Sequence, residues 1–135
     1  MLATSPDYVP ARRHLARALA RLGSRDLEEG RRQQALRRAE VAIRWAPDEP
    51  SAHLLRGSVL AQQGRNEEAL DAIGRALELR PDRWMSHFQR SQVLRAAGRD
   101  DDAMAALREA IALNPEHEDL AGALVVWEGA GPAGS

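Results

Sequence analysis

Three arginines near the start of the chain, Arg13, Arg17 and Arg21, recur at intervals of four residues. On an α-helix this spacing places side chains on one face, so the three guanidinium groups are expected to form a stripe. A guanidinium group offers a planar pair of donors that suits bidentate binding of a carboxylate. The stripe therefore predicts a site for the carboxylate groups of a ligand. The competing interpretation is a helix face that is simply solvated.

Two histidines, His53 and His87, are each followed by an arginine three residues later. Two imidazoles could bind a metal ion, but the neighbouring cationic arginines oppose this and no third ligand is evident. The acidic run Asp100–Asp102 fits the first turn of a helix, where negative charge is stabilising, better than it fits a calcium loop. We therefore expect no bound metal and no cofactor.

The sequence lacks the residue patterns of the common catalytic sites. It has no cysteine, no glycine-rich phosphate loop, no nucleophile elbow and no HExxH motif. Nucleic-acid bases would also have little to stack on, because Tyr8 is the only aromatic residue before Trp45. We therefore expect a protein that is not an enzyme and does not bind nucleic acid.

The composition favours helices as the elements that position these side chains. The 135 residues include 25 alanines and 19 arginines, both strong helix formers. Lysine is absent, which we interpret as the coding bias of a GC-rich bacterial genome. The net charge of −1 is unevenly distributed: residues 1–47 carry ten arginines and five acids, and residues 48–135 carry nine arginines and fifteen acids. Because no apolar run could span a bilayer and no secretory signal is visible, we expect a cytoplasmic protein.

An internal repeat organises the chain, and its period relates His53 to His87. When residues 48–81 are placed over residues 82–115, 12 of the 34 positions are identical without a gap. Each unit predicts two helices, the first ending at a glycine that accepts a left-handed conformation, Gly64 or Gly98. The second helix carries a narrow apolar face, which in the first of these units consists of Ala69, Ile73 and Ala76.

These units resemble the tetratricopeptide repeat (TPR) family. The resemblance implies an all-α, TPR-type α-solenoid of about three helix-turn-helix repeats plus a C-terminal capping helix. It also implies a concave groove, lined by the first helix of each repeat, and the expected partner in this groove is a protein or peptide with acidic and apolar residues. The matching pattern of small, large apolar and proline positions consists of Gly57, Leu60, Ala69, Ile73, Ala76 and Pro81, and again of Ser91, Leu94, Ala103, Leu107, Ala110 and Pro115.

The first repeat is longer than the others by about seven residues, which leaves the position of its turn open. Our preferred prediction is a helix from Val9 to Leu22 that ends at Gly23. The alternative turn at Gly30 would bring Arg25 and Asp26 to buried positions. The predicted organisation is a tail at 1–8, repeats at 9–47, 48–81 and 82–115, a capping helix at 116–128 and a disordered tail at 129–135.

The resemblance also selects candidates for the groove, and it implies a non-catalytic protein-interaction module. An alternative function is a self-assembling scaffold, which would oligomerise through open repeat ends or through Val125, Val126 and Trp127 in the capping helix. The candidate groove residues, on the first helix of each repeat, are Arg13, Arg17, Arg21, Leu54, Ser58, Gln62, Met85, Phe88, Gln92 and Arg95.

Overall fold

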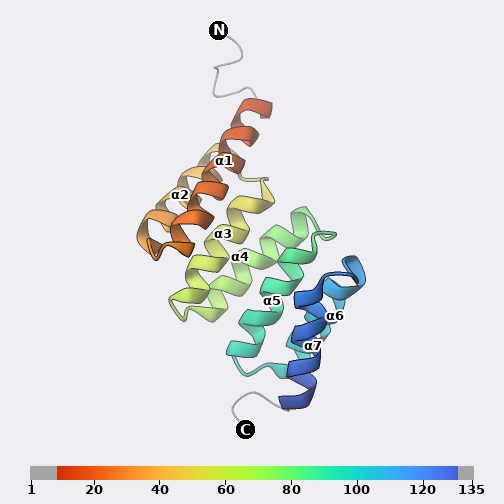
Figure 1. Ribbon diagram of the computed structural model, residues 1–135. Helices are drawn as coiled ribbons and strands as arrows, with labels where there is room; N and C mark the ends of the chain where they lie inside the picture. Colours follow the sequence, from red (N-terminus) through yellow and green to blue (C-terminus); the bar gives the residue numbers. More distant parts are fainter. Residues whose placement is uncertain (1–8, 131–135) are drawn as a thin grey trace.

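The computed structural model describes residues 9–130, which form seven helices and no strand (Figure 1). Alanine, leucine and arginine dominate these segments, and their high helix propensity agrees with this all-α result. The helices are α1 (Val9–Glu28), α2 (Arg32–Trp45), α3 (Pro50–Gln62), α4 (Asn66–Leu79), α5 (Trp84–Ala96), α6 (Asp100–Leu113) and α7 (Glu118–Ala130).

The first six helices form three hairpins that stack side by side (Figure 1). α1 packs on α2, α3 on α4 and α5 on α6, and the hairpins meet where α2 contacts α3 and α4 contacts α5. The first helices of the hairpins are also neighbours, since α3 contacts both α1 and α5. The predicted all-α solenoid is confirmed, and its three first helices line up as a groove requires.

Each hairpin turns at a glycine with positive φ. Gly30, Gly64 and Gly98 have φ values of 82°, 77° and 79°, a region that side chains other than glycine rarely enter. In each turn the next amide bonds back to a carbonyl in the preceding helix, and in the first turn the amide of Arg31 donates to the Asp26 carbonyl at 2.7 Å. The alternative position of the first turn, at Gly30, is therefore correct.

Gly23 lies inside α1, so our preferred prediction of a first helix ending at Leu22 is wrong. The segment from Gly30 to Pro47 is as long as the segment from Gly64 to Pro81. The extra residues consequently lengthen the first helix, which has 20 residues against 13 in α3. The turn itself has the same length in both hairpins.

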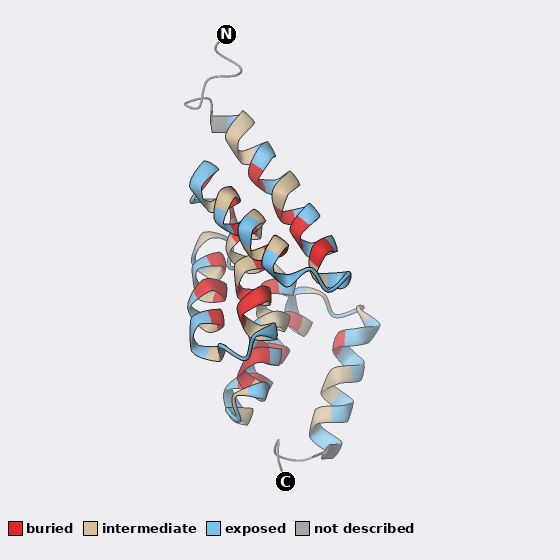
Figure 2. Cartoon of the chain, turned by 90° about the vertical axis from the view of Figure 1, so that its left-hand side faces the viewer, coloured by how far each residue is buried: buried red, intermediate tan, exposed pale blue. Residues whose placement is uncertain are grey.

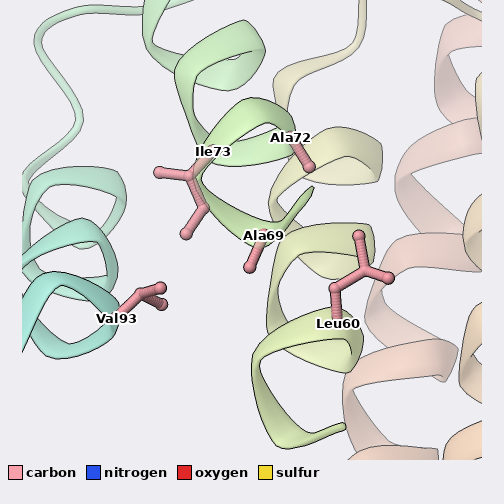
Figure 3. Packing of buried hydrophobic residues seen from close by; sticks show 5 residues of the cluster. All are labelled: Leu60, Ala69, Ala72, Ile73 and Val93. Carbon is pink, nitrogen blue, oxygen red and sulfur yellow. The ribbon is translucent and has the colours of Figure 1, made fainter. Parts of the chain in front are cut away.

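The core consists mainly of small and branched apolar side chains between neighbouring helices. Figure 3 shows Ile73 and Ala69 of α4 beside Leu60 of α3 and Val93 of α5. Packing is close because Gly57 faces α4: a Cβ at this position would lie 2.7 Å from Cγ1 of Ile73. Figure 2 shows buried positions on the faces that the helices turn toward one another. The predicted apolar face of the second helix is therefore confirmed.

The first hairpin has a charged residue in its core. Asp26 stands one repeat period before Leu60, and its relative exposure is only 2%. Its Oδ2 lies 2.6 Å from Nε of Arg38, and its Oδ1 lies 3.1 Å from Nη2 of Arg31. Arg25 beside it is exposed, so the alternative interpretation was correct about the buried aspartate but not about the arginine.

The last helix closes one end of the stack. α7 packs on α6 through Leu120, which is fully buried beside Leu107. The helix begins and ends two residues later than the predicted segment 116–128, so Gly129 and Ala130 are helical and do not belong to a tail. The tail predicted at 1–8 and the remainder of the C-terminal one lie outside the described residues. The boundaries of the three repeats stay predictions.

Candidate functional site

A groove runs along α1, α3 and α5 and contains two adjoining depressions. The larger has a volume of about 820 Å³ and the smaller one of about 420 Å³. Ser24, Ser58 and Gln89 line both depressions, one residue from each of the three helices. The groove is therefore continuous across the three hairpins.

Two of the predicted arginines line the larger depression and form ion pairs with the start of the second hairpin. Nη2 of Arg13 lies 2.5 Å from Oδ2 of Asp48, and both side chains are exposed. Nε of Arg17 lies 2.7 Å from Oε1 of Glu49. The ion pairs connect α1 to the residues just before α3, and they hold two guanidinium groups at the wall of the groove.

Glu49 is a buried carboxylate with three hydrogen-bond donors. It precedes the first residue of α3, and its carboxylate accepts from the amide and the hydroxyl of Ser51 and from Arg17. Burial raises the pKa of the Glu49 carboxyl, but these hydrogen bonds outweigh burial and hold the pKa below its ordinary value. Glu49 is therefore a fixed negative charge beside an otherwise basic groove.

Positive charge prevails in the larger depression. Arg83, at the start of α5, donates from Nη1 to the hydroxyl of Ser51 at 3.2 Å. Arg21 lines the depression and has no ion pair to a carboxylate within residues 9–130. Among the described residues, five arginines and only two carboxylates line this part of the groove: Arg13, Arg17, Arg21, Arg80 and Arg83 against Asp48 and Glu49.

The smaller depression is lined mainly by uncharged polar side chains. The amide of Gln89 donates to the hydroxyl of Ser58, and that hydroxyl donates to the carbonyl of Leu54 at 3.0 Å. Gln62 and Gln92 line the same depression and are exposed. Amide side chains can both donate and accept, so they suit the backbone of an extended peptide.

Apolar side chains interrupt the polar walls of the larger depression. Leu54 and Met85 line it, and Met85 is 53% exposed. These two residues lie on α3 and α5, opposite the arginines of α1. The groove can therefore contact both charged and apolar groups of a ligand.

Two predicted groove residues lie elsewhere. Phe88 packs toward α7, with its ring centroid 6.4 Å from that of Trp84 and with Leu120 in the same cluster. The guanidinium of Arg95 lies 4.8 Å from the ring centroid of Trp127. Neither residue lines either depression, because both are used to hold the last helix.

The other eight candidates line the groove, and further lining residues were not among the candidates. The polar ones on or next to α5 are Arg80, Arg83 and Gln89. The signal for Gln89 was available, because it follows Leu55 by one repeat and belongs to the same helix face as Met85. Arg80 and Arg83 are the first and last residues of the link between α4 and α5, and helical periodicity cannot predict which way the side chains of a link point.

The paired histidines have structural partners. Nε2 of His53 lies 2.7 Å from the carbonyl oxygen of Pro47, and Nε2 of His87 lies at the same distance from that of Pro81. Each contact ties a first helix to the proline before it, which agrees with the preferred interpretation of packing between helices.

Among residues 9–130, none of the helices combines the length and the apolar character that a bilayer span requires.

The stacked hairpins and their groove define a helical-repeat solenoid of the protein-binding class. A family model of the tetratricopeptide repeat matches residues 21–82 and again residues 62–118. The chain belongs to the tetratricopeptide repeat family, whose domains are generally interaction modules that bind peptides or proteins. No curated protein sequence matches the chain.

Several solved structures share the fold. A mutant O-GlcNAc transferase of Thermobaculum terrenum has a TM-score of 0.78 and 24% identity over 84% of this chain, which spans only 22% of the transferase chain. The first TPR of Spaghetti (RPAP3), bound to the HSP90 peptide SRMEEVD, has a TM-score of 0.79 and 16% identity over 87% of this chain and 95% of its own. YrrB, a TPR protein with an unusual peptide-binding site, has a TM-score of 0.71 and 20% identity over 80% of this chain and 56% of its own.

Proposed function

We propose that this protein is a non-catalytic adaptor whose groove binds an extended peptide segment with acidic and apolar residues. The observation that carries the proposal is the charge of the larger depression, where five arginines face two carboxylates among the described residues. Both carboxylates are already paired with arginines, and Arg80 pairs with Asp82 outside the depression, which leaves Arg21 and Arg83 to receive an anionic ligand. Guanidinium groups that are not fully neutralised favour carboxylates as partners.

The order of side chains along the groove supports an extended ligand. The arginines lie in one depression and the amides of Gln62 and Gln92 in the next. Three neighbouring helices at about 9 Å spacing span about 20 Å, which corresponds to about six residues of extended chain. An acidic side chain or a terminal carboxylate would contact Arg21 and Arg83, an apolar side chain would pack on Met85, and the amides would bind the peptide backbone.

A likeness in fold also supports the proposal. The first TPR of Spaghetti was solved with the peptide SRMEEVD, which contains two glutamates and an aspartate. YrrB is a TPR protein with a peptide-binding site as well. A solenoid of this shape is therefore suited to peptides, while the arginines proposed to select the ligand are a property of this chain.

Arg21→Glu is the sharpest variant for testing the proposal. Arg21 is exposed and lines the groove, whereas Arg17 also pairs with the buried Glu49 and its loss would disturb α3. The probe is a fluorescein-labelled peptide of about eight residues in which aspartate and leucine alternate, followed by fluorescence anisotropy. We expect Arg21→Glu to weaken binding about tenfold, and the affinity of the wild type to fall with added salt.

The matched control is Arg37→Glu, which makes the same change on an exposed face of α2 outside the groove. It should leave the affinity within about twofold of the wild type. A second control peptide with lysine in place of aspartate should bind poorly. Equal binding of both peptides, or equal weakening by both variants, would refute the proposed role of the groove arginines.

A further inference from the structure

We propose that copies of this protein associate head to tail, through an acidic and apolar face of α7 and a basic and apolar face of α1. This interaction is separate from peptide binding in the groove. The two surfaces lie at opposite ends of the stack of hairpins (Figure 1). Both are apolar, both are exposed, and their charges are opposite.

The tail face is the outer side of α7. The inner side packs on the solenoid through Leu120 and Trp127. The outer side is also apolar, and Val125 and Val126 are 71% and 63% exposed. Figure 2 shows exposed and half-buried positions along most of this helix. A capping helix of a solenoid normally has a polar outer side, whereas the outer side here carries these two valines. We define the tail face as Glu118, Ala121, Gly122, Val125, Val126 and Gly129, and the exposed Glu118 gives this face its acidic group.

α7 corresponds in the repeat to the first helix of a hairpin, and in the preceding hairpins a second helix covers the side equivalent to the tail face. Val125 follows Ser91 by one repeat period, and Ser91 follows Gly57 by the same interval. Ser91 and Gly57 are buried, and a Cβ on Gly57 would contact Ile73 in the second helix of the same hairpin. Among the described residues no second helix follows α7. The apolar side chains of its tail face are therefore exposed, although the equivalent side chains of the other hairpins pack against a second helix.

The head face lies on α1, at the other end of the stack of hairpins, and it too is an apolar face that no helix among the described residues covers. Leu15, Ala18, Leu22 and Arg25 follow one another at helical spacing, and the two leucines are 40% and 44% exposed. One repeat later, at the place of Arg25, Val59 is fully buried against alanines of α2. The corresponding side of α3 is therefore covered by the preceding hairpin, and no described residue precedes α1.

Charge identifies the occupant as another copy of the chain. α7 contains three carboxylates and no arginine, and one of the three, Glu128, pairs with Arg108 of α6. Residues 9–44, in contrast, contain ten arginines and four carboxylates. Two tail faces brought together would repel each other, and so would two head faces. A tail face against a head face brings opposite charges together and covers exposed leucine and valine side chains, which favours the association electrostatically and hydrophobically.

The groove remains free in such an assembly. The head face lies on a different side of α1 from Arg17 and Arg21, which line the groove. A head-to-tail contact is heterologous, so it does not close after two copies and generates chains of increasing length. The small faces indicate weak association, with a dissociation constant of about 10–100 µM.

Analytical ultracentrifugation of the full chain tests the proposal directly. The average mass of the wild type should rise at least about twofold as the concentration increases from about 5 µM to about 500 µM. It should fall toward the monomer mass when NaCl is raised from about 0.05 M to about 0.5 M, because the Debye length shortens. A constant monomer mass at all concentrations in low salt, or a mass that does not respond to salt, would overturn the proposal.

Two blocked variants distinguish head-to-tail from symmetric association. Val125→Lys with Val126→Lys blocks the tail face, and Leu15→Glu with Leu22→Glu blocks the head face. Each variant alone should be monomeric, whereas an equimolar mixture should form a dimer containing one copy of each and grow no further. Self-association of the head-blocked variant alone would indicate a symmetric contact between α7 helices and refute the proposal.

Control variants place the same charges elsewhere on the exposed surface, with Ala105→Lys on α6 and Arg37→Glu on α2. Both should associate like the wild type, and a loss of association equal to that of the blocked variants would count against the two faces. Far-ultraviolet circular dichroism checks that the helices are intact. The four replaced side chains are all exposed, and the concentration and salt series of the wild type tests the proposal without any substitution.

Discussion

The first hairpin and the two that follow it share the backbone geometry of their turns but differ in the chemistry of the core. At the end of the first helix, Leu60 and Leu94 are buried in the second and third hairpins, and Asp26 takes the equivalent position in the first. Asp26 is paired with Arg38, which stands where the next hairpin has the buried Ala72. The same turn can therefore be held either by apolar packing or by a nearly buried ion pair.

The comparison shows which features of the repeat are indispensable. The glycine with positive φ and the bond from the following amide back to the first helix occur in all three hairpins. The side chain at the end of the first helix, in contrast, changes from aspartate to leucine. The backbone geometry of the turn is thus common to all three hairpins, whereas the side chain beside it varies, and the variants below measure what each contributes to stability.

The largest expected effect is in the second hairpin. Leu60→Ala removes a side chain that is 1% exposed, and it should lower the free energy of unfolding by about 3 kcal/mol through lost burial and a residual cavity. Urea unfolding followed by circular dichroism measures the change. The control Leu22→Ala removes an exposed leucine from α1 and should cost much less. Equal losses would contradict the assignment of the core.

A smaller loss is expected when the ion pair of the first hairpin is broken. Asp26→Ala leaves Arg38 without its buried partner, and we expect a loss of about 2 kcal/mol because Arg38 keeps 28% of its side chain in solvent. The double variant Asp26→Leu with Arg38→Ala copies the second hairpin and should be at least as stable as the wild type. A double variant less stable than Asp26→Ala would show that the first hairpin cannot accept an apolar core.

Much of this fold could be predicted from the sequence, and the exception has a physical reason. Ala69, Ile73 and Ala76 were predicted as an apolar face from their helical spacing, and all three side chains are fully buried. The turn of the first hairpin was misplaced because Asp26 breaks that pattern, and a buried aspartate is recognisable only when Arg38 can be seen beside it. Gly23 was a misleading signal, since it is a close-packing glycine inside α1 rather than a turn residue.

The groove was predicted less completely for a related reason. The arginine spacing correctly placed Arg13, Arg17 and Arg21 along one wall, because that spacing depends on a single helix. The positions of Phe88 and Arg95 depend on where α7 packs, which is a long-range contact with no counterpart in local periodicity. Local patterns therefore identified the wall of the groove but not its end.

The turn itself gives the next effect in size. Gly30→Ala puts a side chain at φ 82°, and it should lower the free energy of unfolding by about 1 kcal/mol. Gly30→Asn should cost less, because asparagine tolerates the left-handed region better than alanine does. Gly64→Ala in the second hairpin should match Gly30→Ala, since its φ is 77°. An unchanged unfolding curve for Gly30→Ala would contradict the turn at this position.

The smallest effect concerns the joint between the first two hairpins and depends on pH. Arg17 and Ser51 hold the pKa of the Glu49 carboxyl below its ordinary value despite burial. A lowered pKa in the folded state contributes stability above the unfolded pKa of about 4.3, and this contribution disappears as the pH falls through the folded value. We expect Glu49→Gln to be less stable than the wild type at pH 7 and the difference to shrink below about pH 4.

The joint between the second and third hairpins has Arg83 at the position equivalent to Glu49. Because an arginine replaces the carboxylate there, the second joint lacks the acid-sensitive contribution that Glu49 makes to the first. Thermal unfolding at a series of pH values measures the difference between wild type and variant. Glu67→Gln makes the same substitution on the exposed first turn of α4 and serves as the control. A stability difference for Glu49→Gln that stays constant down to about pH 3 would mean that Arg17 and Ser51 stabilise the side chain by shape and hydrogen bonding rather than by its charge.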